Sequence, residues 1–196
     1  MDIVVLRPAC LEDAAAILEI YAPYVRDTVI SFEYEPPTLT AFTARMARIM
    51  ETYPYLVAER EGRIVGYAYA SRHMERQAYD WDVEMSVYLD SQIRGQGIGR
   101  ALYSALFGLL RELGYYNAYA IVALSGQGSL AFHQRMGFAE AGIHHRSGYK
   151  FGAWHDVAWL EKPLQESGAP VDPPRRVADC GVNWMAERVR TFTIDL

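Results

Sequence analysis

The residues best suited to chemistry stand where an alternating apolar segment, residues 83–89, gives way to helical spacing from residue 98. Between them lies a loop that contains Arg94, Gly95, Gly97 and Gly99. Glycine has no Cβ, so such a loop lets several backbone N–H groups point into one small space. The first N–H groups of a helix lack intrahelical partners and carry partial positive charge. The loop therefore suits a phosphate or pyrophosphate.

Spacing separates the known kinds of phosphate loop. A Walker loop needs Gly-Lys-Ser/Thr, which is absent, and a dinucleotide loop needs a third glycine where this chain has Arg100. The pattern that is left is Arg94-x-x-Gly97-x-Gly99. On the loop alone, a glycine-rich helix start without a ligand stays an open alternative.

The elements that must position this loop follow from hydrophobic periodicity. Period-two patterns and apolar runs predict strands at 3–7, 55–59, 63–71, 83–89, 117–124, 138–144 and 149–160. Helical spacing predicts helices at 11–21, 38–51, 98–113 and 129–136, with Pro23 weakening the far end of the first. This order is typical of a mixed α/β domain with one central sheet. We expect a single domain over 1–162 and a tail over 163–196, whose four prolines leave its order open.

Composition bounds the class of protein. With 196 residues, half of them hydrophobic, the chain has enough apolar material for one ordinary core. A net charge of −5 without a Lys/Arg run argues against a nucleic-acid partner. Cys10 and Cys180 are far apart, as two incidental free thiols would be. No basic and apolar leader or membrane span is evident, so we expect a cytoplasmic protein.

Five segments in order resemble one family. They read YPYLVAE at 53–59, AYDWDVE at 78–84, RGQGIG at 94–99, LAFHQRMGF at 130–138 and GYKFGAWHDV at 148–157. Together they resemble the phosphinothricin N-acetyltransferases of the GNAT superfamily, which include methionine sulfone and methionine sulfoximine acetyltransferases. The resemblance covers roughly 6–160. It implies a GNAT fold with splayed strands, acetyl-CoA as co-substrate, and a homodimer.

The resemblance also implies where acetyl-CoA binds. A strand that splays from its neighbour leaves main-chain groups free, and an amide-bearing pantetheine can pair with them. The expected pantetheine contacts are Val87, Tyr88 and Leu89, and the expected pyrophosphate loop is Arg94, Gly95, Gln96, Gly97, Ile98 and Gly99. Relatives carry an asparagine where this chain has Gly126; Gln127 or Ser129 would then take over its hydrogen bond, or affinity would be lower.

Acetyl transfer to an amine needs a base for the ammonium proton and a stabilised leaving thiolate. Glu84 is the one acid in the predicted strand 83–89 and matches the catalytic Glu of the family. Without that match, a solvated Glu would be an equally good interpretation. Desolvation by Trp81, Tyr79 and Phe32 would raise its pKa. His133 matches the family's residue near the CoA sulfur and would protonate the thiolate or assist Glu84, with a structural histidine as the alternative.

For the acceptor, Arg76 offers a bidentate fork for a carboxylate or phosphinate, and Phe32 and Tyr79 would close over an aliphatic stem. Lys150 is either another anion contact or a structural or subunit-interface residue. Met74 replaces a basic residue of some relatives, which puts a preference for phosphinothricin in doubt. His144, His145 and His155 lack a positioned carboxylate or Cys set, so we expect no metal.

The sequence therefore predicts an acetyl-CoA-dependent N-acetyltransferase acting on the α-amine of a small amino acid or analogue such as phosphinothricin, methionine sulfoximine or methionine sulfone. One alternative is a GNAT enzyme for another amine, such as a peptide N-terminus or a polyamine. A second is a non-catalytic CoA-binding module.

Overall fold

The structure, a computed structural model, describes residues 3–93, 95–125, 128–166, 168, 172–189 and 193–195. Its strands are β1 (Ile3–Pro8), β2 (Tyr55–Arg60), β3 (Arg63–Arg72), β4 (Asp82–Leu89), β5 (Asn117–Ala123), β6 (Ala139–Lys150), β7 (Ala153–Pro163) and β8 (Thr193–Asp195). Its α-helices are α1 (Ala14–Asp27), α2 (Leu39–Thr52), α3 (Ile98–Leu113), α4 (Ser129–Arg135) and α5 (Trp184–Val189), with short 3-10 helices η1 (Leu11–Asp13), η2 (Gln77–Tyr79) and η3 (Val177–Asp179).

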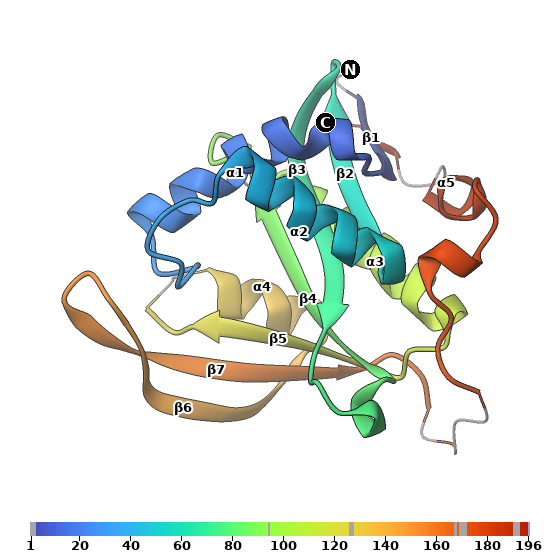
Figure 1. Ribbon diagram of the computed structural model, residues 1–196. Helices are drawn as coiled ribbons and strands as arrows, with labels where there is room; N and C mark the ends of the chain where they lie inside the picture. Colours follow the sequence, from blue (N-terminus) through green and yellow to red (C-terminus); the bar gives the residue numbers. More distant parts are fainter. Residues whose placement is uncertain are drawn as a thin grey trace.

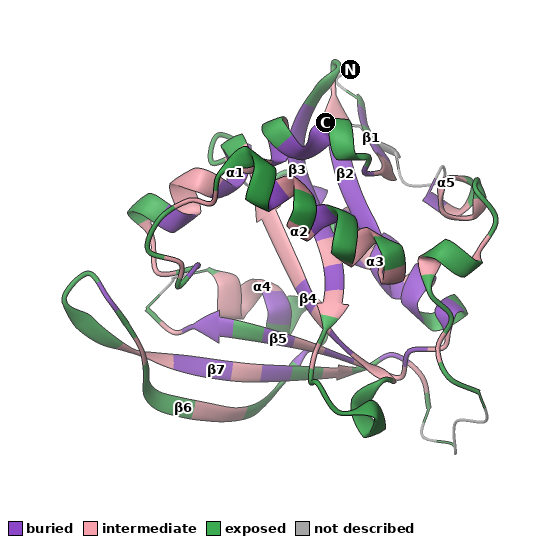
Figure 2. Cartoon of the chain, in the orientation of Figure 1, coloured by how far each residue is buried: buried purple, intermediate pink, exposed green. Residues whose placement is uncertain are grey.

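The strands form one mixed sheet in the order β6-β7-β5-β4-β3-β2-β1-β8. Helices α1 and α2 cover one face of it and α3 lies against the other (Figure 1). Figure 2 shows burial concentrated along the central strands and on the sheet-facing side of the helices. The predicted α/β fold with one central sheet is confirmed.

Helix α3 fixes the position of the glycine loop relative to the sheet. Its apolar side chains recur at helical spacing, and Leu102, Leu106 and Leu110 are each fully buried against the sheet. It begins after Gly97 and ends before Gly114, and both glycines lie in the left-handed region that an L side chain disfavours. The start of the helix is thus fixed by both packing and backbone conformation.

Two boundaries differ from the prediction. Helix α1 continues past Pro23 to Asp27, because the missing N–H of a single proline does not outweigh the packing of Val25. The β6–β7 hairpin turns at Phe151 and Gly152, not at 145–148 as predicted. Residues 145–147 are instead an irregularity within β6, where the register shifts.

The described part of the tail packs back onto the domain. The Leu164 N–H donates to Tyr116 O at 2.8 Å, and the Arg175 N–H donates to Leu113 O at 2.8 Å. Val189 of α5 is buried against the core, and β8 pairs antiparallel with β1. These residues of the tail are therefore ordered against the domain, a point that the sequence left open.

Lys150 joins the β6–β7 hairpin to the end of α1. Its side chain is 2% exposed, and its ammonium donates to the main-chain oxygens of Val25 at 2.6 Å, Thr28 at 2.8 Å and Ser31 at 2.6 Å. An ammonium has three donors, and all three are engaged. Of the two readings of this lysine, the structure supports the structural one.

We expect Lys150→Met to lower the free energy of unfolding by about 2 to 4 kcal/mol, because three buried carbonyls lose charged donors. Urea unfolding at neutral pH measures the change. Lys162→Met is the matched control, since the Lys162 ammonium lies over the Phe107 ring at 5.2 Å and such a contact contributes about 1 kcal/mol or less. Equal losses in the two variants would contradict the assignment.

Candidate active site

The site is built on the point where β4 and β5 part. The two strands pair in parallel at Asp82, Val83 and Glu84 and at no later described residue of β4 (Figure 1). The other side of β4 stays paired with β3 from Arg72 to Gly66. Main-chain groups alternate along a strand, so those that face the gap belong to every second residue after Val83.

Three residues of β4 therefore turn their main-chain groups toward the gap: Met85, Val87 and Leu89. The Tyr103 hydroxyl donates to Met85 O at 3.2 Å, and the Tyr24 hydroxyl donates to Leu89 O at 2.6 Å. Among the described residues, the Val87 amide and carbonyl have no such partner. Of the expected pantetheine contacts, Val87 is the best placed, whereas the Tyr88 main chain faces β3.

The glycine loop places its N–H groups at the end of this gap that follows Leu89. Gly95 and Gly97 adopt φ of 81° and 82°, and the first turn of α3 carries no acidic residue. Ile98 is 1% exposed and can offer a ligand only its main chain, while the Gln96 side chain is exposed. Arg94 lies outside the described residues. This geometry suits an anion at the helix start.

A cavity of about 290 Å³ lies beside the loop, between the starts of α3 and α4. A Cβ on Gly99 would lie 3.3 Å from a Phe132 ring carbon, so the helices approach closely because this residue is glycine. The cavity is lined by Tyr24, Ile30, Val87, Leu89, Gly95, Gly99, Gly128, Ser129, Phe132 and Arg135. Gly126 and Gln127 lie outside the described residues.

Glu84 is the last β4 residue paired on both sides, opposite Ser71 of β3 and Tyr119 of β5. Its carboxylate is half-buried, and burial raises its pKa above the usual value. The predicted direction of the shift thus holds. Its charge in turn helps to raise the pKa of the buried phenols of Tyr69 and Tyr103, which places these rings nearby.

The neighbours expected to desolvate Glu84 have other contacts of their own. The Trp81 indole N–H donates to Asp172 O at 3.1 Å, in the C-terminal segment. Phe32 packs onto the backbone of Gly148, where an added Cβ would meet its ring at 2.4 Å.

His133 lies inside the molecule, 5% exposed, with both ring nitrogens engaged. Nδ1 lies 2.8 Å from Ser129 O, which only a protonated Nδ1 can satisfy, and Nε2 lies 3.0 Å from the Tyr103 hydroxyl. Burial lowers the pKa of the imidazole, although the Ser129 hydrogen bond opposes this. The neutral form is therefore favoured, and its Nε2 then competes with Met85 O for the single proton of the Tyr103 hydroxyl. An acid role for His133 stays a prediction.

The three expected acceptor contacts come from different elements. Arg76 is exposed and precedes η2, and Tyr79 at the end of η2 is 43% exposed. The Tyr79 phenol is close enough to Tyr119 to help raise its pKa, after burial and nearby carboxylates. Phe32 reaches the sheet from the α1–α2 connection. None of the three lines the cavity beside the glycine loop or the cavity of about 820 Å³ under α2.

Sequence reasoning missed several residues beside the site. Tyr103 bridges Met85 and His133, yet it was given no role in the sequence analysis. The His73 ring stacks on Tyr119 at 4.0 Å, and its buried Nδ1 has no hydrogen-bond partner. The place of His73 just after β3 was the one feature of the sequence that could have pointed to it. No feature of the sequence pointed to Tyr103.

No three His, Cys, Asp or Glu side chains of the described residues gather as metal ligands would. None of the described helices is long and apolar enough to span a bilayer.

Comparison with known proteins agrees with this fold. The Acetyltransferase (GNAT) domain matches residues 6–159. A phosphinothricin N-acetyltransferase of Streptomyces viridochromogenes is 35% identical over 172 residues, 88% of this chain and 93% of that protein. A methionine sulfoximine/methionine sulfone acetyltransferase of Salmonella typhimurium is 31% identical over 84% of this chain and 97% of that protein.

Among solved structures, a phosphinothricin acetyltransferase from Sinorhizobium meliloti in complex with AcCoA superposes with a TM-score of 0.81 at 38% identity. The match covers 87% of this chain and 92% of that one. The chain belongs to the GNAT acetyltransferase family. Within it, the N-acetyltransferases of phosphinothricin and of methionine sulfoximine and sulfone are relatives of this chain, as predicted.

Gly99→Ala should raise the KM for acetyl-CoA about five- to tenfold, because the new methyl group pushes Phe132 into the cavity. Steady-state kinetics measure this. Gly108→Ala is the control on the same helix, since a Cβ there meets nothing within 4 Å and should stabilise the protein without changing KM. An unchanged KM in Gly99→Ala would show that acetyl-CoA binds elsewhere.

Proposed function

We propose that this protein transfers the acetyl group of acetyl-CoA to the α-amine of a small amino acid or analogue of the phosphinothricin, methionine sulfoximine or methionine sulfone type. The observation that carries the proposal is the position of Glu84. Its half-buried carboxylate stands where β4 leaves β5, one residue before the gap that the Val87 main chain faces. The names of the relatives supply the class of acceptor.

Each part of the site has a role in this reaction. The Val87 main chain pairs with pantetheine, and Gly95, Gly97 and the start of α3 hold the pyrophosphate. Glu84 takes a proton from the acceptor ammonium, directly or through one water. The free amine attacks the thioester carbon, the C–N bond forms and the C–S bond breaks. The leaving thiolate takes the second proton of the attacking nitrogen, which gives the amide and the CoA thiol.

His133 assists through Tyr103 in this proposal. The contact between Nε2 and the Tyr103 hydroxyl fixes that hydroxyl beside the Met85 carbonyl, at the edge where the thioester would lie. The acceptor contacts proposed from the sequence are Arg76, Tyr79 and Phe32. Arg76 and Tyr79 belong to the segment that leads into β4, the strand that carries Glu84.

We further propose a cytoplasmic homodimer. The tip of the β6–β7 hairpin exposes three large aromatic side chains: Tyr149 is 48% exposed, and Phe151 and Trp154 are each 60% exposed. Clustered aromatic side chains on a surface favour a protein interface. The free thiols of Cys10 and Cys180 suit a reducing compartment.

Glu84→Gln should lower kcat by about 10² to 10⁴-fold while acetyl-CoA still binds with unchanged Kd, because only the proton acceptor is lost. Thiol release and isothermal titration calorimetry measure the two quantities. Asp90→Asn, beyond the end of β4 and ion-paired with Arg63, is a control that should keep turnover. Normal turnover by Glu84→Gln would remove Glu84 as the base.

The same variant has a distinct pH signature. Burial raises the pKa of Glu84 in the folded state, so the base form appears as pH rises through that raised value. The wild-type kcat/KM should rise along this limb, and the limb should be absent from Glu84→Gln. The folded state also binds this proton more tightly than the unfolded state, so the contribution to stability is present at low pH and lost as pH rises. Thermal unfolding should therefore show that Glu84→Gln is more stable, relative to wild type, at pH 8 than at pH 4. A stability difference between the two proteins that does not change with pH would contradict the raised pKa of Glu84.

A further inference from the structure

The connection between β3 and β4, residues 73–81, is longer than most turns between antiparallel neighbours, and it carries two of the proposed acceptor contacts. Arg76 stands just before η2, and Tyr79 stands at the end of η2. The two strands stay paired up to Arg72, so the connection begins within one residue pair of Glu84. Its conformation therefore sets where both acceptor contacts stand relative to Glu84.

The Arg76 side chain does not hold this connection in place. It is exposed, and among the described residues none forms a hydrogen bond or ion pair with its guanidinium. The η2 turn is closed by two main-chain hydrogen bonds of 3.0 Å, from the Tyr79 N–H to Arg76 O and from the Asp80 N–H to Gln77 O. Two hydrogen bonds in an exposed turn open easily, so other contacts must fix the connection.

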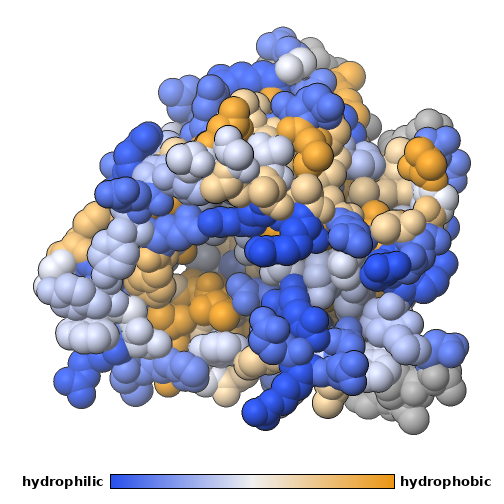
Figure 3. Space-filling model, in the orientation of Figure 1, coloured by the Kyte–Doolittle hydropathy of each residue, from blue (hydrophilic) through white to orange (hydrophobic). Residues whose placement is uncertain are grey.

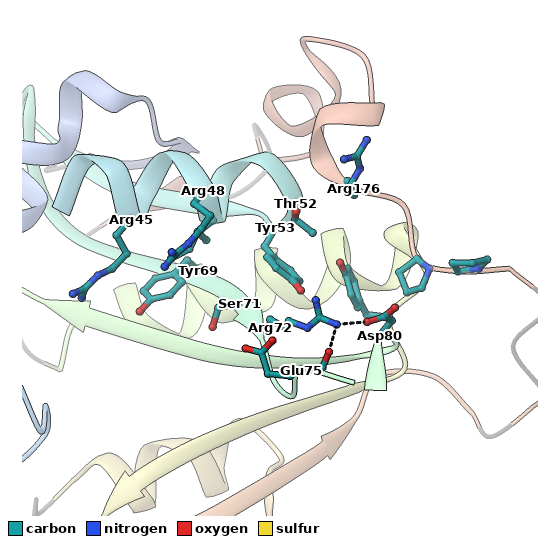
Figure 4. A pocket seen from close by; sticks show the side chains of 14 residues that line it. Arg45, Arg48, Thr52, Tyr53, Tyr69, Ser71, Arg72, Glu75, Asp80 and Arg176 are labelled. Atoms are coloured by element: carbon teal, nitrogen blue, oxygen red, sulfur yellow. Dashed lines mark hydrogen bonds and ion pairs between the residues drawn. The ribbon is translucent and has the colours of Figure 1, made fainter. Parts of the chain in front are cut away.

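Arg72, the last residue of β3, supplies such contacts. Its Nε donates to Met74 O at 2.8 Å, and its Nη2 donates to Glu75 O at 2.7 Å and to the Asp80 carboxylate at 3.0 Å. Figure 4 shows the guanidinium between Glu75 and Asp80, with both contacts drawn as dashed lines. A planar guanidinium fixes the directions of its donors, so these three hydrogen bonds, the Arg72 clamp, tie the start of the connection to its end.

An open space under α2 leaves one side of the connection without packing. A cavity of about 820 Å³ there is lined by Arg72, Glu75 and Asp80, together with Tyr53 and Tyr115. Figure 3 shows the molecule hollowed beneath α1 and α2. Because this space is open, hydrogen bonds rather than side-chain packing must hold the connection on this side.

Aromatic side chains hold the two ends of the connection. The His73 ring stacks on Tyr119 of β5 with ring centroids 4.0 Å apart, and the Trp81 indole N–H donates to Asp172 O at 3.1 Å. Asp172 lies beyond the span 6–159 that matches the GNAT domain, so the C-terminal segment takes part in this arrangement. Between these two anchors, the Arg72 clamp holds the middle of the connection.

Building on the proposed function, we propose that Arg72 is a positioning residue for the acceptor: through the Arg72 clamp it holds Arg76 and Tyr79 where they contact an acceptor bound at Glu84. Arg72 itself does not touch the acceptor, since its guanidinium is engaged by the connection. None of residues 72–81 lines the cavity beside the glycine loop, so the binding of acetyl-CoA does not depend on the clamp.

The test is the steady-state kinetics of Arg72→Gln with phosphinothricin and with methionine sulfone as acceptors. We expect the KM for either acceptor to rise about five- to twentyfold, while kcat and the KM for acetyl-CoA change by less than about twofold. The rise is moderate because the Arg72 and Asp80 side chains are 45% and 43% exposed. Arg72→Lys, which keeps the charge but loses the planar fork, should fall between wild type and Arg72→Gln.

Arg63→Gln is the matched control. Arg63 is also an exposed arginine of β3 in an ion pair, 2.5 Å from Asp90, and it lies at the opposite end of the strand. Its loss should leave the KM for both acceptors unchanged.

A second background separates positioning of the acceptor contacts from a general structural role. When both contacts are removed in Arg76→Gln/Tyr79→Ala, adding Arg72→Gln should change the acceptor KM by less than about twofold, because Arg72 then has no contact to position. An equal rise in both backgrounds, no rise in either, or a parallel rise in the KM for acetyl-CoA would overturn the proposal.

If wild type acetylates neither acceptor, the proposed function fails, and amide hydrogen exchange decides the clamp separately. Arg72→Gln should speed exchange of the Tyr79 and Asp80 amides at least about fivefold and leave the amides of α3 unchanged. Such a local increase supports the clamp, and unchanged exchange at Tyr79 and Asp80 contradicts it.

Discussion

The divergence of β4 from β5 is the constraint on which the rest of the site depends. A sheet normally satisfies both edges of an internal strand, and unpaired buried main-chain groups are costly. Here the parallel pairing stops at Glu84, and the two carbonyls that flank Val87 on this edge accept from Tyr103 and Tyr24. The gap is thus stabilised by two tyrosines from the helices on opposite faces, and it leaves one strand residue available to a ligand.

The same divergence separates the two sides of the proposed reaction. On the α3 side, the glycine loop and the starts of α3 and α4 form the cavity assigned to the donor. On the α2 side, Ser71 and Tyr69 line a cavity of about 820 Å³, and Ser71 stands opposite Glu84 in the β3–β4 register. Lys150 and the C-terminal segment contribute indirectly. Lys150 holds the α1–α2 connection by donating to Ser31 O, and the C-terminal segment is held to the domain by main-chain hydrogen bonds.

Much of the fold could be predicted because the patterns that indicate it lie within single short segments of the sequence. The alternation in β4, the helical spacing of α3 and the glycines before it each report burial along one short segment. The position of the hairpin turn could not, since Gly148 and Gly152 are both plausible turn residues and the choice depends on Phe32 packing onto Gly148. Tyr103 was missed because its role arises from a tertiary neighbour far away in sequence.

The central claim is acetyl transfer to a small amino acid analogue at the Glu84 end of the gap. Its most direct test is thiol release from acetyl-CoA across a panel of phosphinothricin, methionine sulfoximine, methionine sulfone, the common amino acids, spermidine and a short peptide. The account predicts saturable release with the analogues and little with spermidine or the peptide. Release with spermidine or the peptide alone would contradict the acceptor assignment, and no release with any amine would contradict the function itself.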